Sequence, residues 1–210
     1  MNPADPLANP DPALQALLAR RSVSPKRLGA PGPTPAELGW IVRAGLRAPD
    51  HGGLVPWRVI DFAAGDRVAL ADLFAQEKLR RDPLASADDV QRARAHATHA
   101  PALLAFVVCI RAGVTVPAHE QWLAAGAALG NMLGAIHALG FGGIVLSGDR
   151  CSDALLTREL GLRDAEQLAG FISVGSVLKA PPTAAHKELA AVWSQWPGPL
   201  ARRRAADRTS

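Results

Sequence analysis

Two groups of side chains in the first sixty residues could bind a phosphate or the polar edge of a ring. The first is the triplet Arg20-Arg21-Ser22, at the end of a short apolar run. The second is Arg47 with His51, in the segment RAPDHGG. Donors of these types at helix ends and turns suit phosphate oxygens and heterocycles. A phosphate-bearing ligand with a polar ring is therefore the first hypothesis for this chain.

Each group also has an interpretation that involves no ligand. The helix dipole favours arginines at a helix C-terminus, so residues 20–22 alone would be a solvated basic helix end. Arg47 could likewise be a surface arginine where a helix ends, and His51 a turn histidine whose partner is Asp50. The presence of both groups in one chain favours the phosphate hypothesis for the triplet.

A third segment, GFGGIVLSG at residues 140–148, joins a long apolar helix to a short strand. Gly142 and Gly143 would let the backbone approach a ligand closely, although an ordinary turn from helix to strand uses glycine for the same freedom. The chain has no GxGxxG segment after a first strand, so a Rossmann domain is not supported. It also has no Ser-His-Asp set, HExxH motif or P-loop, and its two cysteines form no metal-ligand cluster.

Together the three segments resemble the nitroreductase family of flavin-dependent NAD(P)H oxidoreductases, most closely its YdjA-like branch. The resemblance covers roughly residues 14 to 180, and its specific motifs are RAPDH followed by Pro-Trp, and GFGGI. It implies ping-pong hydride transfer from NAD(P)H, the co-substrate, through FMN to a small-molecule electron acceptor. It also implies a homodimer with FMN at its interface. Because the flavin carries the chemistry, we expect no catalytic side chain and no metal.

The resemblance also assigns roles to individual residues. The triplet is expected at the FMN phosphate and ribityl chain, Arg47 at the flavin pyrimidine edge, and His51 at the flavin of the neighbouring subunit. Backbone groups of residues 143–147 are expected beside the ring. The cofactor-binding residues implied in this way are Arg20, Arg21, Ser22, Arg47, His51, Gly143, Val145, Leu146 and Ser147.

Some positions depart from the family pattern. Leu54-Val55 replaces polar residues before Pro-Trp, and Val145-Leu146 stands where some relatives have Trp-Arg. Residues 180–187 do not clearly match the family's last FMN-contacting segment. These departures motivate an alternative, a flavin-binding or sequestering protein of the same fold without turnover.

Composition supports a single domain of ordinary globular character. The 210 residues are 49% hydrophobic and 20% charged, with a net charge of +4 and a pI near 9.7. We expect a disordered arm at 1–11, one domain at 12–197 and a basic tail at 198–210. The basic pI raises a nucleic-acid-binding dimer as a rival, but aromatic interleaving and recognised motifs are missing. Cys109 and Cys151 as free thiols, with no signal peptide, indicate the cytoplasm.

The order of the expected helices and strands favours an α+β layered sandwich. The resemblance implies the nitroreductase-like α-β-α form of this fold, with a small central mixed sheet. A Thr34–Glu37 capping box begins a helix that should end at Pro49. Two helices with charged outer faces, of the kind that commonly forms a cover or lid, are expected at 65–80 and 86–99. The remaining elements are helices over residues 13–20, 119–139 and 153–160, and strands over residues 57–62, 102–110, 144–147 and 168–174.

The helix predicted over residues 119–139 has features of both a membrane span and an interface. No charged residue occurs from Gln121 to Gly148, but the segment is mostly alanine and glycine and has no strongly basic flank after it. Gly126, Gly130 and Gly134 recur every fourth residue, which leaves a smooth stripe for close helix packing. We therefore predict a buried helix at the dimer interface and no membrane association.

Overall fold

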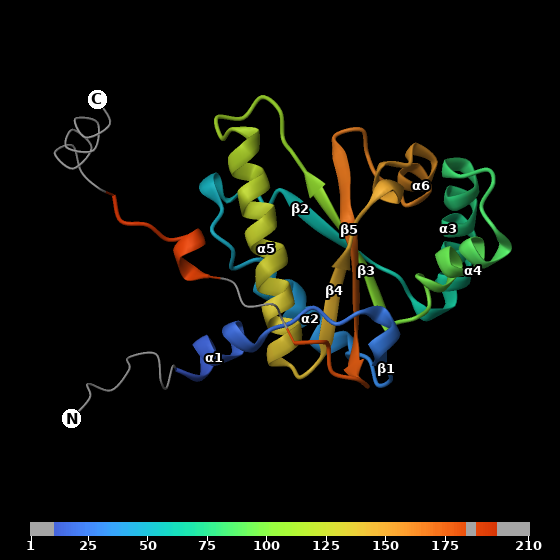
Figure 1. Ribbon diagram of the computed structural model, residues 1–210. Coiled ribbons are helices and arrows are strands. Elements are labelled where there is room, and N and C mark those ends of the chain that lie inside the picture. Colours follow the sequence, from blue (N-terminus) through green and yellow to red (C-terminus); the bar gives the residue numbers. More distant parts are fainter. Residues whose placement is uncertain (1–10, 184–187, 197–210) are drawn as a thin grey trace, which may run out of the picture.

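The structure is a computed structural model that describes residues 11–183 and 188–196 (Figure 1). It has three layers, with a five-stranded sheet between two groups of helices. The predicted arm at 1–11, except Asp11, and the predicted basic tail at 198–210 lie outside the described residues. Asp11 is the N-cap of the first helix, since its carboxylate accepts a hydrogen bond from the Ala13 amide at 2.8 Å.

Six α-helices occur in the described part of the chain, each close to a predicted position. They are α1 (Pro12–Ala19), α2 (Pro35–Gly45), α3 (Arg67–Arg81), α4 (Ala87–Ala95), α5 (Ala118–Ala138) and α6 (Ala154–Glu159). The capping box of α2 forms as predicted, with Thr34 and Glu37 bonded reciprocally. The predicted end of α2 is wrong: the helix stops at Gly45, and residues 46–48 continue as a hydrogen-bonded turn. Arg47 therefore lies after the helix and outside it.

The sheet contains β1 (Leu28–Gly29), β2 (Trp57–Asp61), β3 (Ala102–Cys109), β4 (Gly142–Leu146) and β5 (Glu166–Val177). Its order is β1-β5-β3-β2, with β4 also paired to β5. The prediction of a mixed sheet is wrong for these strands, because all four pairings are antiparallel. The parallel contact found in the described chain is an isolated bridge between Ser22 and Gly143. The short strand β1 was not predicted, because two residues carry no periodicity.

The central strand β3 separates two hydrophobic cores. Leu104, Phe106 and Val108 enter the core with α2 and α5, whereas Leu103, Ala105 and Val107 enter the core with α3 and α6. This alternation is the period-two geometry of a strand. It explains why residues 102–110 read as a continuous apolar run, and the prediction of a strand buried on both faces is confirmed.

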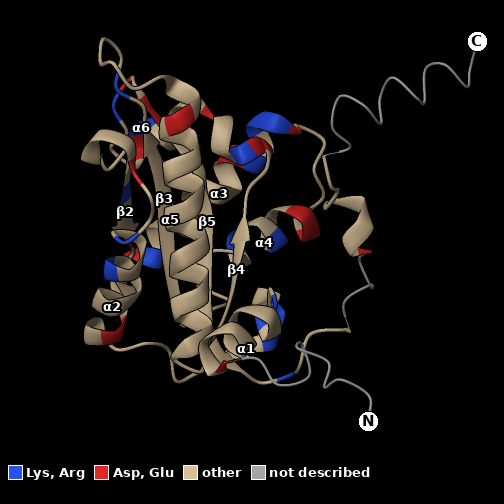
Figure 2. Cartoon of the chain, turned by 90° about the vertical axis from the view of Figure 1, so that its left-hand side faces the viewer, with Lys and Arg blue, Asp and Glu red and all other residues tan. Residues whose placement is uncertain are grey.

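Helix α5 packs one side against the sheet and leaves the opposite side uncovered. Ala125, Ala128 and Met132 are fully buried, while a Cβ added to Gly126 or Gly130 would meet no atom within 4 Å in the described chain. Glu120 is its one charged residue, so the helix is almost uniformly uncharged in Figure 2. No helix among the described residues has the length and apolar character needed to cross a bilayer.

Candidate functional site

The structure brings the first and third sequence motifs into direct contact. Ser22 and Gly143 form the isolated parallel bridge, and the Val23 amide donates a hydrogen bond to the Gly143 carbonyl at 3.1 Å. Gly142 is required here, because a Cβ at this position would lie 2.7 Å from a Val177 methyl group and 3.1 Å from the Val23 Cβ. Segments 120 residues apart in sequence therefore lie side by side, as a shared binding site requires.

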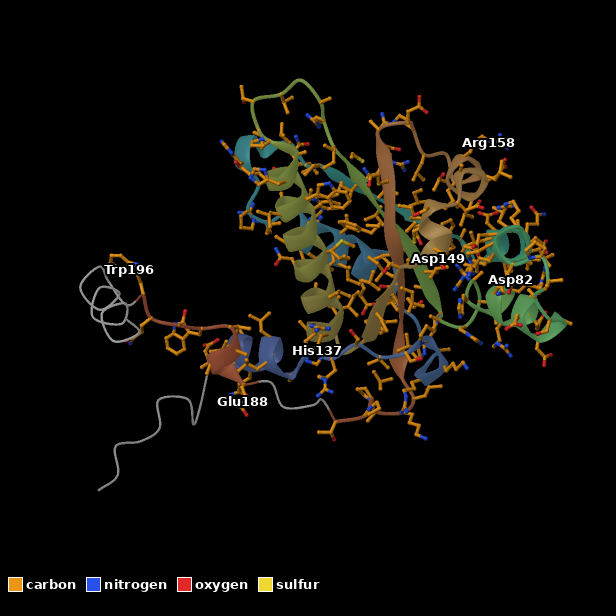
Figure 3. All side chains as sticks on the ribbon, turned by 45° about the horizontal axis from the view of Figure 1, so that its top comes forward. Asp82, His137, Asp149, Arg158, Glu188 and Trp196 are labelled. Atoms are coloured by element: carbon orange, nitrogen blue, oxygen red, sulfur yellow. The ribbon has the colours of Figure 1, made fainter. Side chains whose placement is uncertain are left out.

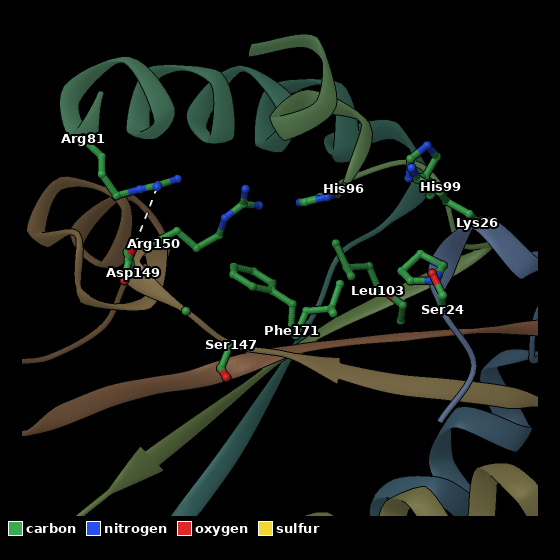
Figure 4. Close-up of a pocket in the computed structure, with 14 residues that line it drawn as sticks. Ser24, Lys26, Arg81, His96, His99, Leu103, Ser147, Asp149, Arg150 and Phe171 are labelled. Carbon is green, nitrogen blue, oxygen red and sulfur yellow. Dashed lines mark ion pairs between the residues drawn. The ribbon is translucent and has the colours of Figure 1, made fainter. Parts of the chain in front are cut away.

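A cavity of about 320 Å³ opens beside this junction, between the sheet and the helices α3 and α4 (Figure 4). Its floor includes Leu103 and Phe171 from the sheet, and Ser147 follows β4 at its edge. Figure 4 shows Ser24 and Lys26 at one end, and Arg81 and Asp149 at the other. The cavity is lined by Ser24, Pro25, Lys26, Arg81, His96, His99, Leu103, Leu146, Ser147, Gly148, Asp149, Arg150, Phe171 and Ser173.

One polar group on the cavity lining lacks a partner. Ser173 is only 1% exposed, and its hydroxyl makes no hydrogen bond in the described chain. It lies on β5, whose next residue, Val174, faces the opposite core with α5. A buried hydroxyl without a partner costs free energy, so its retention on a cavity wall is consistent with a ligand that supplies the missing bond.

The far end of the cavity carries a charged network around the buried side chain of Glu77. Arg81 donates to Glu77 Oε1 at 2.6 Å, and Arg150 lies 3.8 Å from Glu77 Oε2. The Arg150 guanidinium also stacks 4.2 Å from the centre of the Phe74 ring. Burial lowers the pKa of Arg150 from its usual value, with Glu77 opposing the shift. Arg150 is nonetheless always charged at neutral pH.

Two histidines lie between these ends on the helical side. His96 follows the last turn of α4 and His99 the turn after it, with ring centres 6.4 Å apart. Burial, then the nearby charge of Arg150, lowers the pKa of His96 below 6.5. The buried Arg67 fixes this segment by donating hydrogen bonds of 2.7–2.9 Å to the carbonyls of residues 97, 100 and 101. The cavity wall is thus held rigidly from α3.

The second sequence motif, Arg47 with His51, lies away from the cavity. Arg47 and His51 are exposed and do not line the cavity, and the His51 ring bonds to Glu120 of α5 at 2.6 Å. Asp50 instead accepts the amide of Val55 at 2.6 Å. The suggestion that Asp50 satisfies His51 is therefore wrong in this structure. Val55 has a φ of 47°, an unfavourable conformation for a β-branched residue, and this loop of the chain is correspondingly strained.

The structure places only some of the remaining predicted residues at the cavity. Leu146 and Ser147 line the cavity, and Ser22 and Gly143 join at its side. Arg20 and Arg21 do not line it, and Arg21 donates to the Pro182 carbonyl at 2.9 Å. The Val145 side chain packs against the core with α5, which leaves only its backbone to face a ligand.

Sequence reasoning missed most of the cavity lining. His96 and His99 were not among the predicted site residues, yet both lie on the cavity wall. Their i, i+3 spacing directly before a buried strand could have grouped them as candidate site residues. Lys26 follows the triplet at residues 20–22 closely enough to have been included with it. Arg150 and Ser173 carried no signal, because their positions depend on how η4 (Asp149–Ser152) and β5 meet α3.

Comparisons with known proteins identify a family and a fold. The family model described as "Nitroreductase family" matches residues 17–176. "Putative NAD(P)H nitroreductase YdjA" of Escherichia coli (strain K12) is 34% identical over 166 residues, which are 78% of this chain and 87% of that protein.

Two solved structures share the fold. The "Nitroreductase-like Family Protein from Bacillus cereus" has a TM-score of 0.74 at 18% identity, and the match covers 91% of this chain and 100% of that one. A "putative nitroreductase in complex with fmn" from Desulfovibrio desulfuricans has a TM-score of 0.69 at 24% identity, with the same coverage. The predicted layered α+β fold is confirmed.

Proposed function

Because the chain belongs to the nitroreductase family, we propose that it is an FMN-dependent NAD(P)H oxidoreductase acting on a small-molecule acceptor. The observation that carries this proposal is the bridge between Ser22 and Gly143, which joins the first and third motifs beside one cavity. One relative is named as an NAD(P)H nitroreductase, and one structural neighbour is described in complex with FMN. The cytoplasm remains the predicted compartment.

The residues present fit a flavin on three counts. The cavity offers about 320 Å³, a floor with Leu103 and Phe171 for a ring, and cationic side chains at both ends. Ser173 has a buried hydroxyl that needs a partner. Gly142 and Gly143 keep the junction with residues 22–23 close. An apolar cavity with a few fixed polar groups is typical of a cofactor site.

Each part of the chain then has a role. Arg20, Arg21 and Ser22, just before the Ser24 end of the cavity, hold the phosphate and ribityl chain by charge-assisted hydrogen bonds. The backbone of residues 143–147 lies along the ring, and Phe171 and Leu103 exclude water beneath it. When bound, FMN supplies the two-electron chemistry, and the protein contributes binding, orientation and electrostatics. NAD(P)H and the acceptor use the same open side in turn.

We propose further that the active unit is a homodimer built on α5. The uncovered glycine stripe at Gly126 and Gly130 offers a flat surface on which a second copy of the helix can approach closely. The strained loop with Arg47 and His51 adjoins the N-terminal part of this helix through the His51–Glu120 contact. A two-fold interface there would present His51 to the cavity of the partner, as the resemblance implies.

The test is the visible spectrum of the purified protein before and after addition of NADPH without oxygen. We expect a yellow protein with a flavin spectrum that bleaches on reduction and recovers when a nitroaromatic acceptor is added. A colourless protein that does not take up added FMN would contradict the proposal. Bound flavin that NADPH cannot bleach would support the alternative of a flavin-sequestering protein without turnover.

A further inference from the structure

The guanidinium of Arg150 is a largely buried cation on the cavity lining. Its side chain is only 14% exposed, yet it makes no hydrogen bond to the residues that the structure describes. Its contacts are the Phe74 ring at 4.2 Å and the Glu77 carboxylate at 3.8 Å, which is beyond hydrogen-bond range. A guanidinium carries five N–H donors, so Arg150 keeps donors available for a ligand.

The neighbouring acids account for only part of this arginine. Arg81 donates to Glu77 Oε1 at 2.6 Å, while Glu77 Oε2, which has no hydrogen bond in the described chain, forms an ion pair with Arg150 at 3.8 Å. Asp149 lies 3.6 Å from Arg81 and is 79% exposed, so water screens its charge. In Figure 4 the Arg150 side chain extends along the cavity towards His96, above Phe171 and away from Asp149. The electrostatic effect of Arg150 on His96 agrees with this direction.

Arg150 also lies at the end of the cavity that the proposed FMN phosphate does not use. Ser24, two residues after the triplet at 20–22, is at the opposite end. A flavin anchored by that triplet leaves its ring, and any molecule stacked on the ring, to the part of the cavity nearer Arg150. The free donors of Arg150 therefore face the second substrate more directly than the phosphate of the cofactor.

We propose that Arg150 binds an anionic group, a carboxylate or a phosphate, of the molecule that exchanges electrons with the flavin. This inference rests on the proposed function and adds a substrate class to it. The planar guanidinium matches a carboxylate or phosphate in a bidentate pair, and partial burial strengthens the bond. Two sources share this chemistry: an acidic acceptor, and the phosphates of NAD(P)H.

The experiment compares 4-nitrobenzoate with 4-nitrobenzamide, which have nearly the same shape but differ in charge. Binding of each to the flavin-loaded protein is measured by calorimetry, and NADPH-driven reduction of each gives kcat/KM. We expect the wild type to favour the carboxylate about tenfold or more, and Arg150→Gln to reduce this preference to about twofold or less. Arg158→Gln, which removes an arginine that is outside the cavity lining and has a 70% exposed side chain, should keep the preference.

Further measurements and variants identify the source of the anion and the role of Arg150. Stopped-flow reduction by NADPH identifies the nucleotide as the source if only that step weakens in Arg150→Gln. Arg150→Lys keeps a charge beside Glu77 and tests the proposal if the glutamine variant does not fold, since it should retain part of the preference. A wild type that binds and reduces both probes equally well, together with NADPH reduction that is unchanged in Arg150→Gln, overturns the inference but leaves the proposed function standing. Loss of FMN affinity equal to the loss for nitrobenzoate would make Arg150 a cofactor residue and also overturn it. A protein without flavin or nitroreduction would contradict the proposed function, and calorimetry with the two probes would still test the anion site.

Discussion

The two faces of the sheet are covered by different kinds of residue. On the face with α2 and α5, the core is apolar apart from the buried Gln121, and the outer side of α5 is glycine-rich and carries no charge beyond Glu120. On the face with α3, α4 and α6, arginines, histidines and a buried glutamate surround a cavity. Figure 3 shows this division, with His137 on α5 on one side of the sheet and Asp149 on the other, near α3.

This difference suggests that the faces have separate tasks, one for assembly and one for ligand binding. The predicted site residues follow the division, since Leu146 and Ser147 lie on the cavity while His51 contacts α5. A ligand in the cavity can meet both groups only if a second chain supplies the loop with His51. Four experiments test whether the two faces have these separate tasks.

The largest effect is expected from substitutions of glycine on the two faces. Gly130→Leu adds a side chain where the described chain leaves open space, so the folded chain should keep its thermal stability while the dimer and its flavin are lost. Gly142→Ala places a Cβ 2.7 Å from Val177 and 2.8 Å from Leu28, and should lower unfolding free energy by about 1–3 kcal/mol. Light scattering shows whether each variant is dimeric, and thermal melts show whether it has lost stability. A wild type that is monomeric and fully loaded with flavin would rule out the shared site.

The next effect concerns the phosphate. Arg20→Ala should weaken FMN binding by about 1.5–3 kcal/mol, because a charge-assisted hydrogen bond to the phosphate is lost. This is roughly tenfold or more in affinity. Riboflavin, which has no phosphate, is the matched control and should bind almost as before. If fluorescence titration shows equal losses of affinity for FMN and riboflavin, Arg20 does not contact the phosphate.

Subunit exchange tests the placement of His51 directly. If each site takes Arg20 from one chain and His51 from the other, mixing impaired Arg20→Ala and His51→Ala dimers creates some intact sites. Activity should recover to about a quarter of the wild-type value, since half the dimers are mixed and half of their sites are whole. Exchange is verified by native mass spectrometry. With complete exchange and two impaired variants, an absence of recovery would place His51 in its own subunit's site or in none.

The smallest effect concerns the helix that carries the cavity histidines. The Ser86 hydroxyl and amide lower the pKa of Asp89 from 3.8 to about 2 in the α4 capping box. Because the folded pKa lies below the unfolded value, this cap stabilises the protein above about pH 4 and is lost as the pH falls towards 2. Urea unfolding of wild type and Asp89→Asn should therefore differ at neutral pH and converge below pH 2. A constant difference across that range would mean that the carboxylate charge contributes nothing.

Much of the fold was predictable because it is encoded locally. The capping box at Thr34 and the continuous apolar run at residues 102–110 each act within a few residues, so the sequence predicts six helices and four strands near their observed positions. Periodicity does not set strand direction, which is why the sheet was expected to be mixed. The end of α2 was misplaced, because the turn at residues 46–48 competes with helix over one turn only.

The family motifs, the apolar pattern of the layers and the small-residue stripe of α5 can be read from the amino-acid order alone, since each is a property of neighbouring residues. The folded chain was needed to show that Ser22 meets Gly143, that His96 and Arg150 face one cavity, and that His51 lies apart from it. These placements depend on contacts between segments far apart in the chain. Burial and hydrogen bonding across the whole fold fix such contacts, and no local pattern records them.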